Sequence, residues 1–288
     1  MLNGPASAKG SLVIVGGGLS ADNDAVYNAF IDRAKGGQIA VIVTASGEPQ
    51  ASFDAIAANL ERYGVDRSRI SLIALAEVDD PSTSIDEAGW SVNADKPQEI
   101  AKINQANAIW FTGGDQARTA RLLLRKGRDT LMLAAIRKRL RAGAVIGGTS
   151  AGAAIMGTGM IVCGDPKHAH EPLGRSFDDC AATNGKPEPL VLGKGLGFLR
   201  GYVVDQHFGQ RSRLPRLLRA MACGAGWGIG IDEDTAVVVD LAKRTASVLG
   251  RGRVVTIEHP RPRNDCAFNL GLTDVVFHES GQPVNLQR

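Results

Sequence analysis

The chain has 288 residues, of which 44% are hydrophobic and 22% are charged, and its formal net charge is +3. This composition excludes a disordered chain, and so small a net charge gives no support for a nucleic-acid partner. No apolar run approaches the roughly 18 residues of a membrane-spanning helix, so we expect no membrane partner either.

Short β-rich runs alternate with longer helical segments along most of the chain. Apolar runs predict strands at 11–15, 39–44, 70–74, 108–111, 144–146, 202–204, 235–240, 246–249 and 254–257. Apolar residues at helical spacing predict helices at 22–35, 52–63, 117–125, 130–141, 151–156 and 213–221. This alternation predicts an α/β fold with a doubly wound, mostly parallel sheet flanked by helices, and antiparallel strands at its C-terminal edge.

The organisation of the chain indicates a single domain over residues 1–288. No internal repeat, low-complexity tract or linker interrupts the pattern. The segment at about 163–197 fits neither a helix nor a strand and is predicted to be an irregular insertion. Long loops of this kind in compact domains are usually functional or disordered.

The cysteines give an expectation about the cellular compartment. Cys163, Cys180, Cys223 and Cys266 are scattered without a C-x-x-C pair, which predicts neither a disulfide framework nor a zinc site. A reducing compartment fits such cysteines. The only apolar run near the start, Leu12–Val15, is too short for a signal peptide, so the sequence predicts a cytoplasmic location.

A candidate nucleophile follows the apolar run at 144–146. Gly148-Thr149-Ser150-Ala151-Gly152 is a G-x-S-x-G motif placed between a predicted strand and a predicted helix. The flanking glycines allow a tight turn that exposes the Ser150 hydroxyl, and the start of the helix offers N–H groups to a developing oxyanion. The alternative is a phosphate-binding or purely structural turn.

A serine nucleophile needs a general base, and histidine is the usual one. His207 lies in Asp205-Gln206-His207-Phe208, at the carboxyl end of a predicted strand, where α/β sheets place their sites. The other histidines are weaker candidates: His168 and His170, which with Glu171 could form a metal site by composition alone, and His259 and His278, expected to be ordinary surface residues.

The third member of a catalytic triad is a carboxylate that orients the imidazole. Asp232, Glu233 and Asp234 stand together between two apolar runs. One of them could face the site, or all three could belong to a solvated turn, and their spacing does not decide between them.

Four segments together resemble a known family. They are 111–116, 148–153, 205–208 with the arginines that follow it, and 230–236. In their order and approximate spacing, over residues 12–249, they are similar to the serine peptidases related to aspartyl dipeptidase, the family that includes the cyanophycinases. The resemblance does not extend to the insertion at 163–197.

The resemblance implies a role for each matching residue. Ser150 would be the nucleophile, His207 the base and Glu233 the orienting acid, an order that differs from the serine–acid–histidine order of α/β-hydrolases. Members of the family typically form homodimers and use no metal and no cofactor. The implied oxyanion hole uses backbone N–H groups near Gly113 and Gly114 and at Ala151.

The expected substrate is acidic. Arg211, Arg213 and Arg216 follow the candidate base closely, and the planar guanidinium of arginine suits bidentate binding of carboxylates. The resemblance implies cyanophycin, a poly-Asp backbone carrying Arg through side-chain amides, cut to β-Asp-Arg dipeptides. The implied substrate-binding residues are Gln116, Asp205, Gln206, Arg211, Arg213 and Arg216. Alternatively, the arginines simply decorate the start of a helix.

Three rival functions remain at this point. A related serine peptidase could act on short β-aspartyl or other acidic peptides. The glycine-rich turns at Gly16–Gly18 and Gly113-Gly114 could bind a nucleotide phosphate in a non-enzymatic protein, although they lack the G-x-G-x-x-G fingerprint. A glutamine-amidotransferase-like hydrolase would normally require cysteine at position 150, where this chain has serine.

Overall fold

The computed structural model describes residues 8–174, 180, 189–223, 226–258 and 274–286. Its larger sheet has eight strands, of which five neighbouring strands run parallel, whereas the C-terminal strands join antiparallel at one edge. The strand order is β16 (Pro283–Val284), β13 (Thr245–Gly250), β12 (Thr235–Asp240), β1 (Ser11–Val15), β7 (Val145–Thr149), β4 (Ala106–Phe111), β2 (Gln38–Ile42) and β3 (Ile70–Ile73). This arrangement confirms the predicted fold class.

A second sheet, of six strands, was not predicted. Its order is β15 (Asp274–His278), β14 (Val254–Glu258), β11 (Trp227–Ile231), β10 (Leu199–Asp205), β8 (Gly157–Cys163) and β9 (Val191–Lys194). Strands β10 and β14 match predicted strands, whereas glycines interrupt the apolar runs of β8, β9 and β11, which were not predicted. Glycine in a strand usually marks a bulge or a close backbone approach, and the pairing of β8 with β10 does shift register.

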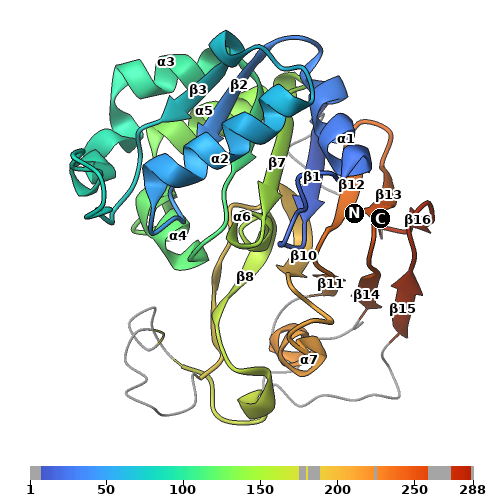
Figure 1. The fold of residues 1–288 in the computed structure, drawn as a ribbon. Coiled ribbons are helices and arrows are strands. Elements are labelled where there is room, and N and C mark those ends of the chain that lie inside the picture. The colour runs from blue at the N-terminus through green and yellow to red at the C-terminus, as the bar shows by residue number, and fades with distance from the viewer. Residues whose placement is uncertain (1–7, 175–179, 181–188, 224–225, 259–273, 287–288) are drawn as a thin grey trace.

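Helices and the second sheet cover the two faces of the larger sheet (Figure 1). On one face, α1 (Asp24–Ala34) and α2 (Pro49–Arg62) pack against one buried apolar cluster. On the other face, a larger cluster joins residues of both sheets to those of four helices. These are α3 (Pro97–Gln105), α4 (Gln116–Leu123), α5 (Leu131–Ala142) and the short α6 (Ala151–Ala154). Finally, α7 (Leu214–Ala222) packs on the smaller sheet with a third cluster.

The helix boundaries follow from capping residues. The Asn23 side chain accepts from the Val26 N–H at the start of α1, and Thr130 does the same for Leu133 at the start of α5. Helix α2 begins at Pro49, three residues before the predicted start, because proline is well suited to the first helical position. With 14 residues α2 is the longest helix described, and no helix in the described ranges is long and apolar enough to cross a bilayer.

Minor elements complete the described chain. A two-stranded hairpin joins β5 (Leu124–Arg125) to β6 (Arg128–Asp129). Three 3-10 segments, η1 (Arg67–Arg69), η2 (Ala88–Asp95) and η3 (Pro166–His168), connect larger elements. The predicted irregular insertion at 163–197 therefore contains regular structure, because η3 and β9 both lie in it. Its residues 175–179 and 181–188 lie outside the described chain.

The cysteines correct the sequence analysis. Cys163, at the end of β8, forms a disulfide with Cys180, across a sequence separation of 17 residues. Cys223 is disulfide-bonded as well, and no described cysteine is free. Cys266 lies outside the described residues. The prediction of unpaired cysteines is therefore wrong, since sequence spacing without a fold does not tell which sulfurs meet.

Candidate active site

Ser150 lies on a strained turn between β7 and α6. Its backbone has φ 54° and ψ −114°, a conformation that L-residues rarely adopt. The Ser150 N–H donates to the carbonyl of Val15 on the neighbouring strand β1, at 3.0 Å, which holds the turn against the sheet. Strain of this kind persists where the surrounding structure over-determines it, as at active sites. The predicted tight bend at the G-x-S-x-G motif is thus present.

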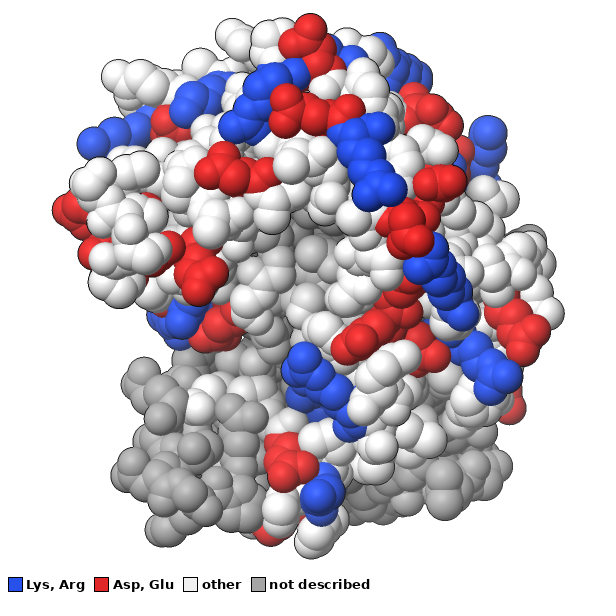
Figure 2. All heavy atoms as spheres, in the orientation of Figure 1, with Lys and Arg blue, Asp and Glu red and all other residues white. Residues whose placement is uncertain are grey.

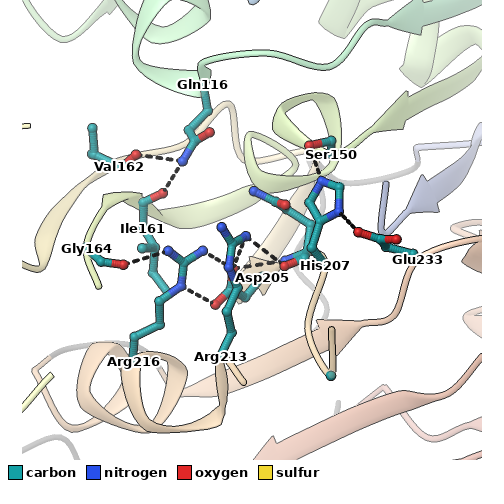
Figure 3. Close-up of polar contacts among 12 residues, drawn as sticks. Gln116, Ser150, Ile161, Val162, Gly164, Asp205, His207, Arg213, Arg216 and Glu233 are labelled. Atoms are coloured by element: carbon teal, nitrogen blue, oxygen red, sulfur yellow. Dashed lines mark hydrogen bonds and ion pairs between the residues drawn. The ribbon is translucent and has the colours of Figure 1, made fainter. Parts of the chain in front are cut away.

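The imidazole of His207 reaches this serine from the other sheet. His207 is the second residue after Asp205, where β10 ends, and its backbone also has a positive φ, of 46°. Its Nε2 lies 2.8 Å from Ser150 Oγ, a hydrogen-bond distance (Figure 3). The two residues that the sequence analysis paired as nucleophile and base are therefore in direct contact.

Of the three neighbouring acids, only Glu233 contacts the histidine. Glu233 Oε1 lies 2.5 Å from His207 Nδ1, the ring nitrogen opposite the serine (Figure 3). Asp232 accepts instead from the backbone of Gly209 and Arg253, and Asp234 accepts from Ser20 and Asn23. The two aspartates hold the loop in place, while the glutamate contacts the imidazole. The spacing of the three acids in the sequence could not tell which of them has this role.

The first glycine-rich turn supports the histidine. The Gly16 carbonyl accepts from the His207 N–H at 2.6 Å. A Cβ on Gly17, whose φ is +102°, would lie only 2.3 Å from His207 Cε1. Because the imidazole packs directly on this backbone, the turn is filled by the site itself. This observation disfavours the phosphate-binding interpretation of Gly16–Gly18.

Burial sets the protonation state of the base. Desolvation lowers the pKa of His207 below its ordinary value of 6.5, and the hydrogen bond that His207 donates to Glu233 opposes that shift without cancelling it. A lowered pKa means that the imidazole is neutral near pH 7, with Nε2 free to accept the serine proton.

This shift predicts the pH dependence of the reaction. Protonation of His207 removes the base, so kcat/KM should fall as the solution becomes acidic, with a midpoint below pH 6.5. Above the midpoint kcat/KM should rise to a plateau that extends to about pH 8. The measurement is a pH profile of kcat/KM, which reports groups of the free enzyme. An acidic limb centred above pH 6.5 would contradict the assignment.

The predicted oxyanion-hole residues lie beside Ser150, since Gly113 and Gly114 line the same cavities as the serine and Ala151 follows it in the chain. Among the described residues, the N–H groups of Gly113, Gly114 and Ala151 have no hydrogen-bond acceptor. A Cβ built on Gly113 would lie 3.4 Å from Ser150 Cβ, and one on Gly114, with φ +131°, only 2.0 Å from the Ala45 carbonyl oxygen. The helix after the serine is shorter than predicted, ending at Ala154 rather than 156, so individual N–H groups matter here rather than a helix dipole.

A polar cavity of about 490 Å³ opens on one side of Ser150. Four guanidinium groups line it, those of Arg121, Arg211, Arg213 and Arg216, together with Gln116, Gln206, Asp115 and both half-cystines of the Cys163–Cys180 disulfide. We call this space the arginine cavity. It brings together five of the six predicted substrate-binding residues and adds Arg121, which sequence reasoning missed because it lies on α4, far from the motifs.

Asp205 is the exception among the predicted substrate-binding residues. It is 1% exposed, and its carboxylate is engaged by Arg216 through Nε at 2.7 Å and Nη2 at 2.5 Å (Figure 3). Arg213 Nη1 lies 3.5 Å from the same carboxylate and donates to the Gln206 carbonyl at 2.7 Å. Because both carboxylate oxygens are occupied by protein partners, Asp205 positions two arginines and does not itself line the cavity.

The three arginines differ in how firmly they are held. Arg216 is 4% exposed and also donates to the Gly164 carbonyl, so most of its N–H groups are already used. Arg211 is exposed at the cavity. The guanidinium groups of Arg213 and Arg216 are therefore held by protein partners, whereas Arg211 lies at the surface, ahead of α7, which begins at Leu214.

The two glutamines differ as well. Gln116 Nε2 donates to the carbonyls of Ile161 and Val162, which fixes its side chain at the wall of the cavity (Figure 3). Gln206 Oε1 is buried and has no hydrogen-bond partner among the described residues. An unpaired buried acceptor costs about 1–3 kcal/mol, so a donor group on a bound molecule would find a partner here.

The other described histidines, His168, His170 and His278, take no part in this site. His168 Nδ1 lies 3.3 Å from Asp165 in its own turn, and the described residues contain no group of three ligands that could hold a metal ion. His278 was expected at the surface but is only 9% exposed, and its Nε2 contacts Thr256 Oγ1 at 2.9 Å. His259 lies outside the described residues.

Comparison with known proteins agrees with this geometry. The model of peptidase family S51 matches residues 12–245, which is most of the chain. The chain belongs to peptidase family S51. This S51 peptidase is therefore a serine-type peptidase, and the glutamine-amidotransferase-like alternative is not favoured.

Relatives of this S51 peptidase include named enzymes. It is 33% identical over 254 residues to a cyanophycinase of Synechococcus elongatus, covering 87% of this chain and 67% of the relative. It is 30% identical over 259 residues to a cyanophycinase of Trichormus variabilis, covering 88% of this chain and 75% of the relative. The crystal structure of a peptidase from an acI-B1 actinobacterium covers 97% of this chain and 98% of its own, with a TM-score of 0.62 and 19% identity, which shows a shared fold.

Proposed function

We propose that Ser150, His207 and Glu233 form the catalytic triad of this peptidase. The observation that carries the proposal is a pair of linked hydrogen bonds. One joins Ser150 Oγ to His207 Nε2 at 2.8 Å, and the other joins His207 Nδ1 to Glu233 Oε1 at 2.5 Å. Such a pair activates a serine hydroxyl and fixes the tautomer of its base.

The proposed reaction is acyl transfer. His207 Nε2 takes the proton from Ser150 Oγ while the oxygen attacks the scissile carbonyl carbon, and the tetrahedral oxyanion accepts from the N–H groups of Gly113, Gly114 and Ala151. The same imidazole returns the proton to the departing nitrogen as the C–N bond breaks. Water then attacks the acyl-enzyme by the reverse proton route and releases a carboxylate and free Ser150.

We propose cyanophycin as the substrate, cut to β-Asp-Arg dipeptides. The names of the relatives support this choice, and so does the arginine cavity beside Ser150. Guanidinium groups suit the arginine α-carboxylate that each β-Asp-Arg unit presents. The buried Gln206 Oε1 offers an acceptor to N–H donors of the same unit.

A direct test compares the polymer with shorter substrates. The purified protein should release soluble β-Asp-Arg from insoluble cyanophycin, measured by chromatography, and a fluorophosphonate should label Ser150. Cleavage of isoaspartyl dipeptides alone would favour the related peptidase on short β-aspartyl peptides. Absence of both cleavage and labelling would favour the non-enzymatic ligand-binding alternative.

Arg211 provides a test of substrate recognition. It is exposed in the arginine cavity, and its guanidinium has no ion-pair partner among the described residues. We expect Arg211→Ala to raise KM for cyanophycin fragments by about 10- to 100-fold, as for the loss of a charge-assisted contact, with a smaller change in kcat. Arg200→Ala, which removes an exposed arginine of β10 outside the cavity, is the matched control. Equal kinetics of the two variants would contradict a role for Arg211.

Assembly, domain organisation and location are also proposals. The apolar cluster shared by both sheets supports a single domain over residues 1–288, and homodimer formation stays a prediction that light scattering can test.

The cytoplasmic location also stays a prediction, but its premise of free cysteines no longer holds. Because disulfides persist in oxidising compartments, the Cys163–Cys180 bond supports such a location instead, and thiol alkylation of intact cells would decide between the two.

A further inference from the structure

A second cavity, of about 300 Å³, opens at Ser150 beside the arginine cavity. It lies next to α2, α1 and β4, and it also includes the serine and the base. Figure 2 shows a hollow beneath α2 whose visible lining has few charged atoms. We call it the neutral cavity, since no lysine, arginine, aspartate or glutamate lines it; its main side chains are Leu19, Tyr27, Ile56, Asn59, Trp110 and Thr112.

The two cavities contrast in chemistry and meet at the nucleophile. Ser150 lines both of them, whereas His207 lines only the neutral cavity. Burial raises the pKa of Tyr27 to about 12, so its phenol is uncharged at any physiological pH. A substrate bound with its scissile carbonyl at Ser150 would therefore extend into an arginine-rich space in one direction and an uncharged, partly aromatic space in the other.

The position of the imidazole tells which part of the substrate occupies which cavity. In the proposed mechanism His207 protonates the departing nitrogen, so the nitrogen and its substituents must lie on the imidazole side of the scissile carbon. That side is the neutral cavity. The acyl portion, which stays on Ser150 as the ester, then lies in the arginine cavity.

We propose that the neutral cavity is the leaving-group subsite, which binds the first residue on the amine side of the scissile bond. This inference rests on the proposed function. The walls suit an aliphatic or planar group, since a guanidinium or alkyl stem can lie against an aromatic face, and Asn59 and Thr112 supply polar groups for an amide. The absence of charged lining residues means that this subsite selects by shape, whereas the arginine cavity selects by charge.

The test narrows the neutral cavity without touching the catalytic residues. Ala55 lines it from the exposed face of α2, so Ala55→Trp adds bulk there without disturbing the core. Ala58, equally exposed on the same helix and outside the cavity, gives the matched control Ala58→Trp. Two substrates with the same acyl group are compared. In the first, the backbone carboxyl of an N-acetylated β-Asp-Arg unit is joined to a second β-Asp-Arg unit. In the second, the same carboxyl of the N-acetylated unit is a methyl ester, whose leaving group is methanol.

We expect Ala55→Trp to lower kcat/KM for the two-unit peptide by at least about tenfold and to leave that for the methyl ester within about twofold, while Ala58→Trp changes neither. Equal losses on both substrates would place the acyl group in the neutral cavity and overturn the assignment, as would unchanged kinetics on both. Failure of the wild-type protein to hydrolyse either substrate would overturn the proposed function itself. The two failures are therefore distinguishable.

Discussion

Replacing Ser150 by alanine is expected to lower kcat for cyanophycin fragments by about 10⁴- to 10⁶-fold, the range found when a catalytic serine is removed. The variant lacks the oxygen that attacks the carbonyl, and the imidazole cannot replace it. The fold should survive, because among the described residues the Ser150 hydroxyl hydrogen-bonds only His207, and the alanine keeps the Cβ and the backbone hydrogen bond to Val15.

The measurement is product release over hours at high enzyme concentration, with thermal unfolding as a check of the fold. Ser247→Ala, on β13 next to the edge strand β16, is a control that removes a hydroxyl far from the site. If Ser150→Ala retained more than about 1% of wild-type kcat, the nucleophile would have to be another residue.

Replacing Asp205 by asparagine is expected to lower the free energy of unfolding by about 3–5 kcal/mol, the cost of breaking a buried ion pair by removing one partner. Asp205 is 1% exposed and Arg216 4% exposed, so the guanidinium would be left buried without a counter-charge. Because the same carboxylate also lies within 3.5 Å of Arg213, the walls of the arginine cavity should shift and KM should rise as well.

Urea denaturation of the wild type and three variants distinguishes the loss of a buried ion pair from the loss of an exposed one. Asp54→Asn removes one partner of an exposed ion pair with Arg67 and should cost less than about 1 kcal/mol. The double variant Asp205→Leu with Arg216→Met should recover much of the stability lost in Asp205→Asn, since apolar residues can replace a buried pair, but it should not recover a low KM. A loss below 1 kcal/mol for Asp205→Asn would show that the pair is not buried in solution.

Much of the site could be predicted from the sequence because it depends on local patterns. The turn at Ser150 follows from glycines placed between an apolar run and a small-residue segment, and His207 follows from its position at the end of an apolar run. Both features require only neighbours along the chain. The parallel strands of the larger sheet were predicted for the same reason, since they are continuous apolar runs.

The rest depends on contacts between segments distant in sequence. Nothing local distinguishes Glu233 from the aspartates beside it, because each is selected by a different partner from another loop. Asp205 was assigned to the substrate, whereas its carboxylate is used by Arg216, eleven residues away and across a helix start. The disulfide of Cys163 with Cys180 and the pairing of strands into the smaller sheet likewise become visible only when the chain is folded.

The pairing of β1 with β12 determines when the enzyme can first work during its synthesis. Strand β1 is made before the other described strands, and the carbonyls of Val15, its last residue, and of Gly16, which follows it, hold the turns that carry Ser150 and His207. One of its two neighbours, β12, is translated only after residue 234. At a translation rate of about 5–20 residues per second, tens of seconds pass between the synthesis of β1 and that of β12, and the two strands can pair only then. A ribosome-bound fragment ending before β12 would therefore be inert, and proteolytic competence would come only after β12 has been made.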